Sequence, residues 1–476
     1  MNQQDELRNM NRTNSIYAVI IRRFFEQFQH ITYHGVPICK YVSRIYMNRW
    51  NAATIQKYLP QLRPAISRLD FSQFYHWFDD PYPYDAHPEG VVLMRGGFGD
   101  LAAIYLPPER SFLLCPNQAE VDLIKRNRPD LTTHSIQSYY KENPQAVASL
   151  TSQFTQVIEQ YQDDPFTGTP EFRMWIQSRI PEIVKTLDAI ESLFQRMNIG
   201  AVLSVSSTYS MDGAMNLLAK AHRVPSLTLQ HGLIAEHDLF AHIPILATKK
   251  MVWGEATRQW YHKFGFPESR VAPIGSPRFD MIFNRPWRDK ESLCKILNVP
   301  PSHQIIVYAT QIFKYTQNIA PIVLEALQSV PNIVIVMLLH PGEKPEPYQQ
   351  LVNGYPNCKL IQFGHISLYD ALSGGDLFIT YYSTAALEAM FFNLPVITVE
   401  PVKPSFSFGD LGASIKVANA AELKQAVKRL LKDPTYRQQS VQKYQQFLSQ
   451  YCIPDGFAAK RLFDEVQQLC QTSGTA

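Results

Sequence analysis

Apolar residues recur at helical spacing from Ser15 to Asp70, with polar residues at the positions between them. Apolar positions three and four residues apart form one face of an amphipathic helix. The stretch 79–84, rich in proline and aromatic residues, then interrupts regular structure. We therefore predict a helical appendage over residues 1–84.

From residue 85 onward, short apolar runs alternate with amphipathic segments. The first run is followed by a glycine-rich turn, Gly96-Gly97-Phe98-Gly99-Asp100. Strands that alternate with helices predict a parallel sheet covered on both faces, here a Rossmann-like unit over residues 85–285. Its predicted strands are 90–94, 199–205, 225–229 and 250–254, with helical periodicity over 144–196 and a helix over 211–222.

Three prolines between Val271 and Arg288 indicate a linker, after which the alternation restarts. We predict a second doubly wound unit over residues 286–450 and a C-terminal helix within 451–476. The fold class is therefore α/β, and we expect the two units to face each other across a cleft. The second unit's predicted strands are 304–309, 332–339, 359–363, 376–380 and 396–399, and the predicted helices are 320–329, 367–373, 385–392, 421–431 and 457–469.

Composition agrees with a globular chain of more than one domain. The 476 residues exceed what one core usually supports, and 45% of them are hydrophobic and 18% charged. A net charge of +3 gives no argument for nucleic acid as a partner. The six cysteines show no CxxC pairing, and the first fourteen residues lack the pattern of a signal peptide. We expect a cytoplasmic protein without a transmembrane segment.

The region up to Arg68 is basic, with ten Lys or Arg residues against three acidic ones. A basic surface interleaved with aromatic residues is one way to contact the inner face of an anionic membrane peripherally. The alternative is a helical appendage whose basic face lies in solvent, which is the usual place for a charge run.

The segment from Tyr381 to Met390 joins a buried strand to a helix through Ser383 and Thr384. A helix N-terminus with added hydroxyl donors is suited to bind a phosphate. The alternative is that one of the two hydroxyls only caps the helix. His231 and His340 also follow predicted strands, and ligands of open parallel sheets lie at that edge.

Four motifs together carry a resemblance: Gln230-His231-Gly232, Gly275-Ser276-Pro277-Arg278-Phe279-Asp280, His340-Pro341, and Ser383-Thr384 with Glu388. In this order they resemble glycosyltransferases of the two-Rossmann GT-B fold. The branch that is most similar makes bacterial surface polymers and includes CDP-glycerol glycerophosphotransferases, capsular Kdo transferases and bacterial sialyltransferases. The resemblance covers about residues 200–400.

The resemblance implies that His231 deprotonates the acceptor hydroxyl, a role that suits the usual pKa of histidine. Glu236 and Asp238 follow on the same loop and are candidates to orient it. Asp212 and Asp100 are rival bases, and the second resembles the Gly-Asp turn of heptosyltransferases. Each of the two has an alternative role as a cap or turn residue.

For the nucleotide donor, the resemblance implies that His340, Ser383 and Thr384 contact the phosphate. Pro341 fixes the turn, and Glu388 lies near the ribose. Arg278 offers a guanidinium for the same phosphate oxygens, with a structural ion pair as the alternative. No Asp-x-Asp motif follows a strand, so we predict metal-independent transfer without a cofactor.

Three functions remain open from the sequence. The first is a transferase that moves a sugar or polyol phosphate from a nucleotide-activated donor to a glycan or lipid-linked acceptor, in capsule or related surface polysaccharide synthesis. The second is a hydrolysing UDP-sugar 2-epimerase, for which a lone Glu388 after Ser383-Thr384 supplies few acids. The third is a non-catalytic subunit that binds a nucleotide-sugar.

Overall fold

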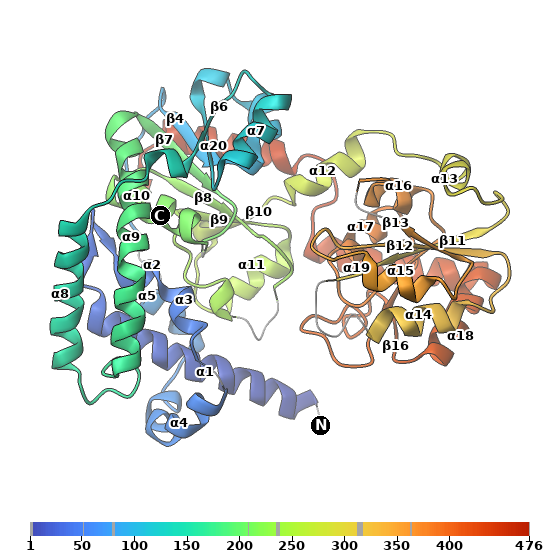
Figure 1. Ribbon diagram of the computed structural model, residues 1–476, viewed down its shortest axis with the longest axis horizontal. Helices are drawn as coiled ribbons and strands as arrows, with labels where there is room; N and C mark the ends of the chain where they lie inside the picture. Colours follow the sequence, from blue (N-terminus) through green and yellow to red (C-terminus); the bar gives the residue numbers. More distant parts are fainter. Residues whose placement is uncertain are drawn as a thin grey trace. The chain divides into compact units, whose positions relative to one another are not determined.

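The chain divides into two compact units in a computed structural model that describes residues 3–50, 52–78, 81–207, 209–234, 239–311, 318–361 and 364–475. Unit 1 comprises residues 1–252, 256–274 and 459–476, and unit 2 comprises 253–255 and 275–458 (Figure 1). Each unit is described by itself. The two doubly wound parallel-sheet units are confirmed, whereas a cleft between them stays a prediction.

The sheet of unit 1 has seven strands that pair in parallel in the order β10-β9-β8-β7-β4-β5-β6. Alternate residues of β7 pack into different cores, with Val202 on one face and Leu203 on the other. Both faces are therefore buried, which explains why the central strands β4, β5 and β7 are largely apolar. The strands are β4 (Val91–Arg95), β5 (Ser111–Cys115), β6 (Thr132–Ser135), β7 (Ile199–Ser204), β8 (Ser226–Leu229), β9 (Lys249–Val252) and β10 (Val271–Pro273).

Helices cover both faces of this sheet. Residues of α9 and α10 belong to the core on one face, and residues of α6 and α20 belong to the core on the other. Side chains of Asn143 and Thr169 cap the first turns of α8 and α9, which lie side by side (Figure 1). The helices are α6 (Gly99–Tyr105), α7 (Gln118–Asn127), α8 (Pro144–Gln160), α9 (Pro170–Arg196), α10 (Ser210–Ala221), α11 (Glu255–His262) and α20 (Ala458–Gln471).

The N-terminal helices belong to unit 1 and do not form a separate domain, which corrects the predicted boundary near residue 85. Phe24 and Phe28 of α1 contact Phe172 of α9 at ring-centroid distances of 6.0 and 5.5 Å, inside the core shared with α10. The helical period predicted the helices of this region but neither the strands β1 and β2 nor where the apolar faces of the helices pack. These elements are α1 (Gln3–Phe28), β1 (Thr32–Tyr33), β2 (Val36–Pro37), α2 (Ile38–Tyr41), α3 (Ser43–Met47), α4 (Ala52–Ile66), α5 (Phe74–Phe78) and β3 (Pro83–Tyr84), which pairs with β17 (Gly474–Thr475).

The C-terminal helix also corrects the predicted division, because residues 459–476 return to unit 1. Leu462, Phe463 and Val466 of α20 are buried in the core beside β4 and β5. Among the described residues, none of the helices combines the length and the apolar content needed to cross a bilayer.

Unit 2 contains a six-stranded parallel sheet in the order β13-β12-β11-β14-β15-β16. Strand β11 lies in the middle, and its residues from Ile305 to Tyr308 are almost completely buried. The register pairs Val307 with Val336 on β12 and with Phe378 on β14. The strands are β11 (Gln304–Ala309), β12 (Ile333–Leu338), β13 (Cys358–Ile361), β14 (Leu377–Thr380), β15 (Val396–Val399) and β16 (Ile415–Val417).

The predicted linker 271–288 is wrong, because it contains strand β10 and helix α12. Pro277 occupies the first turn of α12, where a proline ring does not interrupt helical hydrogen bonds. The helices of unit 2 are α12 (Pro277–Asn284), α13 (Lys290–Leu297), α14 (Ile319–Leu327), α15 (Glu346–Val352), α16 (Leu368–Ser373), α17 (Ala385–Phe391), α18 (Ala420–Lys432) and α19 (Pro434–Tyr451).

Candidate active site

A cavity of about 580 Å³ lies at the carboxyl ends of β11, β12 and β13 and the loop after β14 in unit 2. This is the edge at which open parallel sheets bind ligands. The structure brings together residues as far apart in sequence as Arg278 and Glu388, which are separated by 110 positions. All six residues predicted for the donor line the cavity: Arg278, His340, Pro341, Ser383, Thr384 and Glu388.

The loop after β14 presents two half-buried hydroxyl groups, those of Ser383 and Thr384. Ser383 Oγ accepts the N–H of Ala385 at 3.2 Å, so this hydroxyl also caps the helix. The N–H groups of Ala386 and Leu387 donate to the carbonyls of Ser383 and Thr384 at 3.0 and 2.9 Å. The first N–H groups of α17 are therefore already bonded, contrary to the sequence-based expectation, because the chain turns tightly into the helix. What the loop offers a phosphate is its two hydroxyl groups.

His340 follows β12 and is exposed at the cavity. Its Nδ1 accepts the N–H of Gly342 at 3.1 Å, so the neutral ring carries its proton on Nε2. Its backbone N–H donates to Thr310 Oγ1 at 3.0 Å, and Thr310 is in turn hydrogen-bonded to Glu343. The loop thus holds an imidazole with one N–H donor available to a ligand.

Glu388 and Arg278 form an ion pair with a distance of 2.7 Å from Oε1 to Nη2. The Glu388 side chain is fully buried, whereas that of Arg278 is 57% exposed. Tyr369 donates its hydroxyl to the same Oε1 at 2.7 Å, and burial together with the nearby carboxylate raises the pKa of Tyr369. The second oxygen, Oε2, is buried and has no hydrogen-bond partner. An unsatisfied carboxylate oxygen is costly, and a ligand hydroxyl at this position would remove that cost.

The remaining lining of the cavity is largely apolar, with Leu338, Leu339, Ile361, Ile366 and Leu368. An apolar wall beside a few convergent polar groups is typical of a site for an organic phosphate such as a nucleotide. Two useful residues were missed by the sequence reading. Thr310 stands directly after β11 and was detectable by its strand-end position, whereas nothing in the sequence links Tyr369 to Glu388.

Asp212, one of the two rival bases, is fully buried at the start of α10 in unit 1. Its Oδ2 lies 2.5 Å from Nη1 of Arg95 at the end of β4, and its Oδ1 accepts the N–H of Val205 at 3.0 Å. Burial raises the pKa of Asp212, and Arg95 opposes this rise. Both oxygens are engaged inside the protein, so this geometry favours an internal ion pair over a base that reaches a substrate.

Lys250 on β9 is a second buried charge near Asp212. Its residue is 4% exposed, and burial lowers its pKa to about 8, while the Asp212 carboxylate opposes the effect. Burial also lowers the pKa of His242 to about 3, with further contributions from Lys250, Arg44 and His231. Arg95 and Lys250 are therefore two cationic groups close to the buried Asp212 carboxylate.

His231 follows β8 in unit 1 and is exposed. Gln230 is buried and fixes the turn, because its side-chain amide donates to the Gly232 carbonyl at 2.9 Å and its backbone N–H donates to Met251 at 2.8 Å. The His231 ring packs edge-on against Tyr209 at a centroid distance of 5.6 Å. Glu236 and Asp238 lie outside the described residues, so their expected role in orienting His231 stays a prediction.

Asp100, the other rival base, is exposed in the first turn of α6. Its charge acts on Arg128, and α6 contributes Ala102 to the core opposite the one that α10 joins. The structure therefore does not bring Asp100 and Asp212 to the same side of the sheet. Within the described ranges, no group of three or more His, Cys, Asp or Glu residues is arranged to hold a metal ion.

Comparison with known proteins gives a family match that spans the cavity of unit 2. Residues 253–468 match the family model of CDP-glycerol:poly(glycerophosphate) glycerophosphotransferases. This stretch includes every residue that lines the cavity and begins after His231. No curated protein sequence matches the chain.

Several solved structures share the fold at low sequence identity. A UDP-N-acetylglucosamine 2-epimerase is 15% identical, with 79% of this chain and 95% of that chain covered and a TM-score of 0.53. The Neisseria meningitidis enzyme of this type, bound to UDP-GlcNAc, is 13% identical over 79% and 99% of the chains, with a TM-score of 0.53. The wall teichoic acid polymerase TagF is 14% identical over 88% and 98%, with a TM-score of 0.48.

The fold is therefore of the GT-B type. The resemblance to the glycerophosphotransferase branch is confirmed by the match over residues 253–468, and the expectation of a transferase enzyme agrees with it. The roles of the individual residues stay predictions.

Proposed function

We propose that the chain transfers a sugar or a polyol phosphate from a nucleotide-activated donor to an acceptor hydroxyl, and that the donor binds in the cavity of unit 2. The observation that carries this proposal is the fully buried Glu388, which lines the cavity with one oxygen unpartnered, together with the hydroxyls of Ser383 and Thr384. A nucleotide offers the complementary groups, since a ribose has hydroxyl donors and a diphosphate has anionic oxygens.

Each part of the donor has a partner of suitable chemistry in the cavity. Glu388 Oε2 accepts a ribose hydroxyl, and Ser383 and Thr384 donate to the phosphate. His340 Nε2–H donates to the same phosphate, and Arg278 adds a positive charge at the exposed end of its ion pair with Glu388. Leu338, Leu339 and Ile361 contact the flat face of the base.

The reaction is a displacement at the carbon or phosphorus atom that carries the nucleotide leaving group. The acceptor oxygen loses its proton to His231 and forms the new bond, while the bond to the nucleotide phosphate breaks and that phosphate takes the electron pair. Negative charge develops on the departing phosphate, where His340, Ser383 and Thr384 donate hydrogen bonds. These donors stabilise the leaving group without a metal ion, and no organic cofactor takes part.

His231 is the proposed base because it is exposed at a strand end, whereas Asp212 is sealed in an ion pair. An imidazole titrates near neutral pH and accepts a proton from an alcohol most effectively there. The acceptor is a glycan or a lipid-linked glycan, and the product is a bacterial surface polysaccharide made on the cytoplasmic side. The basic N-terminal region supplies a peripheral contact with the membrane.

Nucleotide binding is tested by a thermal-shift screen of the full chain with CMP, CDP, UDP and GDP. A ligand that binds only the folded state raises the unfolding midpoint, and at a fixed concentration a tighter ligand raises it more. The double variant Ser383→Ala, Thr384→Ala is expected to lose most of the shift given by the best nucleotide. The control Thr435→Ala changes an exposed residue of unit 2 and retains the shift. An unaltered affinity in the double variant would reduce the pair to a helix cap.

The base is tested by turnover of a panel of nucleotide-activated donors with acceptor extracts. His231→Ala is expected to lower kcat by about 10²–10⁴-fold, which is the usual contribution of a general base. His30→Ala, an exposed histidine of the same unit, serves as the control. Turnover unchanged by His231→Ala disproves the role, and an effect on donor affinity alone moves His231 to a binding role.

The second candidate is a hydrolysing UDP-sugar 2-epimerase. It remains a candidate because two solved enzymes of this type have the same fold as this chain. The match to a transferase family over the donor cavity favours transfer. The two functions differ in one observable, because an epimerase consumes its donor without any acceptor. Nucleotide release that requires an added acceptor supports transfer, whereas release without one supports the epimerase.

A further inference from the structure

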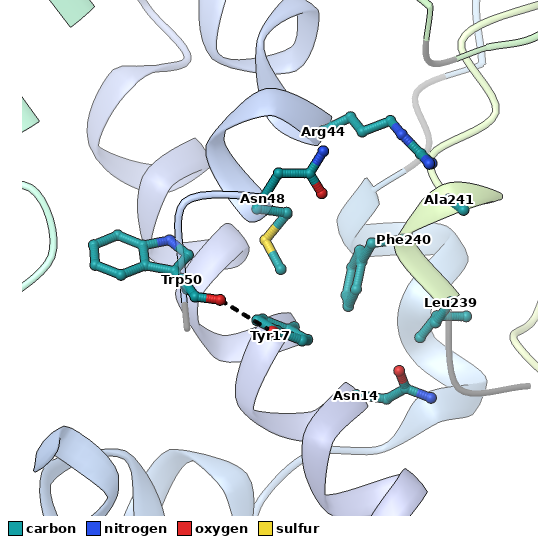
Figure 2. A pocket seen from close by; sticks show the side chains of 9 residues that line it. Asn14, Tyr17, Arg44, Asn48, Trp50, Leu239, Phe240 and Ala241 are labelled. Atoms are coloured by element: carbon teal, nitrogen blue, oxygen red, sulfur yellow. Dashed lines mark hydrogen bonds between the residues drawn. The ribbon is translucent and has the colours of Figure 1, made fainter. Parts of the chain in front are cut away.

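A second cavity, of about 260 Å³, lies in unit 1 between the N-terminal helices and the segment η5 (Leu239–Ala241). Asn14 and Tyr17 come from α1, and Arg44 and Met47 come from α3. Figure 2 shows the Arg44 side chain reaching toward Ala241, with the Asn48 amide beside it and the Phe240 ring on the opposite wall. The cavity therefore has a cationic end and an apolar wall.

Arg44 is half-buried and has no ion pair with a carboxylate in the part of the chain that the structure describes. Two other partly buried arginines of this unit, Arg95 and Arg23, have carboxylate partners, whereas Arg49 and Arg110 donate to backbone carbonyls. Partial burial removes some of the water around this guanidinium, and no carboxylate replaces that water. Its N–H donors are therefore suited to bind the oxygens of an anionic ligand.

Among the described residues that line the cavity, further polar groups accompany Arg44 and none is acidic. The amides of Asn14 and Asn48 face the cavity rim, and the Tyr17 hydroxyl donates to the Trp50 carbonyl at 3.4 Å (Figure 2). The Trp50 indole itself turns away from the cavity in this view. Amides and one cation together match an anion that also carries hydroxyl groups.

A residue lining this cavity, Arg44, and the candidate base, His231, both act electrostatically on the same residue, His242. His242 directly follows the η5 segment and feels the charges of both Arg44 and His231. The same field includes the buried Lys250. Arg44 and His231 thus both lie close enough to His242 to influence its pKa, and an anion held beside Arg44 would lie on the same unit of the protein as His231.

We propose that the cavity lined by Arg44, Asn48 and Phe240 binds a phosphate ester of the acceptor, with Arg44 as the principal contact. This proposal rests on the proposed transferase function, since it assigns to unit 1 the site that holds the acceptor near His231. The volume has room for about eight or nine water molecules, which suits a phosphate with a short polyol or one sugar-sized fragment. The phosphate belongs either to a soluble phosphate ester or to a lipid headgroup.

The test uses glycerol 3-phosphate, with uncharged glycerol as its matched control, titrated calorimetrically into the full chain. All proteins carry Ser383→Ala and Thr384→Ala, so that phosphate binding in unit 2 does not mask the signal. Arg44→Gln is expected to weaken binding of glycerol 3-phosphate at least tenfold, and Asn48→Asp is expected to weaken it similarly through repulsion. Arg63→Gln, an exposed arginine of α4, leaves the affinity unchanged.

A second arm measures binding to vesicles of phosphatidylglycerol and of phosphatidylcholine. Binding to the anionic vesicles that Arg44→Gln abolishes and Arg63→Gln retains supports the site and assigns the phosphate to a lipid headgroup. Equal binding of glycerol 3-phosphate and of vesicles by the Arg44→Gln and Arg63→Gln proteins overturns the proposal. Because Asn48→Asp changes an exposed residue, its result does not depend on a perturbed core.

Failure of this site is distinguishable from failure of the proposed function. In the otherwise unaltered chain, Arg44→Gln retains the thermal shift given by nucleotides if unit 2 binds the donor. If the chain binds nucleotides but Arg44→Gln leaves the binding of glycerol 3-phosphate and of vesicles unchanged, the phosphate site alone is rejected. Conversely, phosphate binding that depends on Arg44 in a chain that binds no nucleotide rejects the transferase and keeps the anion site.

Discussion

Two buried carboxylates occupy equivalent places in the two units, and each is paired with an arginine, but the two pairs differ in what they leave available to a ligand. Asp212 lies in the first turn of α10 after β7, and Glu388 lies in the first turn of α17 after β14. Each carboxylate is fully buried and bonded to an arginine, Arg95 in unit 1 and Arg278 in unit 2. The two carboxylates thus have the same position in the fold, whereas Arg95 ends strand β4 and Arg278 lies in the first turn of helix α12.

The two carboxylates differ in how many of their oxygens have a hydrogen-bond partner within the protein. Both oxygens of Asp212 are bonded within the protein, and the Arg95 side chain is only 16% exposed. Glu388 keeps one oxygen without a partner, and the Arg278 side chain is 57% exposed beside a cavity. A buried charge at a strand end therefore indicates a binding site only when part of its bonding capacity is left for a ligand.

The largest effect is expected from removal of the two arginines. Arg95→Met leaves a buried carboxylate without its cation and is expected to lower the free energy of unfolding by about 3–5 kcal/mol near pH 7. Arg278→Met also leaves a buried carboxylate, Glu388, but Tyr369 still donates to that carboxylate and the lost cation is mostly exposed, so a smaller cost of about 1–3 kcal/mol is expected. Urea unfolding of both variants measures the difference.

The pH dependence of Arg95→Met gives a further check. Burial already raises the pKa of Asp212 and Arg95 opposes this, so the variant raises that pKa further. A carboxyl with a raised pKa in the folded state loses stability as pH rises through that value. The cost of Arg95→Met is thus expected to shrink as pH falls toward 5. Equal costs for the two arginine variants would break the comparison.

This contrast also shows what the sequence could predict. The donor residues were found because each follows a strand or opens a helix, and a parallel sheet brings such positions to one edge. The burial of Asp212 was not readable, because Arg95 lies 117 positions away and no local pattern connects them. The same limit applies to the N-terminal helices, whose period predicts a buried face but not its partner, α9.

Strand prediction missed β5 although its residues are mostly apolar, and it missed β6 because composition gave no apolar run there. The residues of β6, Thr132–Ser135, are polar because only alternate positions are buried at this edge of the sheet. In contrast, the central strand β11 was predicted with its observed bounds, since both its faces are covered and its residues are uniformly apolar.

The second prediction concerns Lys250, the other buried cation near Asp212. Its pKa of about 8 lies below the ordinary value near 10.5, so the unfolded chain binds more protons between these pH values. The wild-type protein therefore gains stability as pH rises from about 8 to about 10.5. Lys250→Met is expected to raise the free energy of unfolding by about 3 kcal/mol at pH 7, with the gain fading over that window.

Chemical denaturation of the Lys250→Met protein at pH 7, 8, 9 and 10 measures this dependence, and Lys57→Met on the exposed surface of α4 is the control. A destabilised Lys250→Met protein at pH 7 would mean that the lysine and Asp212 form a net favourable pair. That result would make unit 1 still more dependent on internal charge pairing.

The third prediction concerns the unpartnered oxygen of unit 2. Glu388→Gln keeps the shape of the side chain and an acceptor for Tyr369 but removes the charge. A hydrogen bond to a charged group contributes about 1.5–3 kcal/mol, so nucleotide affinity is expected to fall roughly tenfold to hundredfold. Stability is expected to change by less than about 1 kcal/mol, because Arg278 remains hydrated. Calorimetry with the best nucleotide and urea unfolding together separate the two effects.

The smallest effect is expected from Tyr369→Phe, which removes only the hydroxyl that donates to Glu388 Oε1 at 2.7 Å. The ring contact with Trp287, at a centroid distance of 5.0 Å, is kept. The expected loss of stability is about 1 kcal/mol, because Arg278 still bonds the same oxygen. Nucleotide affinity is expected to change less than about threefold, because Oε2 of Glu388 is untouched. Burial and the Glu388 carboxylate raise the pKa of Tyr369, so its hydrogen bond stabilises the fold fully below pH 10, the ordinary value for tyrosine. The stability difference between the wild-type and Tyr369→Phe proteins is therefore expected to be constant from pH 7 to 9. A large loss of nucleotide affinity in this variant would mean that donor binding depends on the bonded oxygen of Glu388 as well as on the free one.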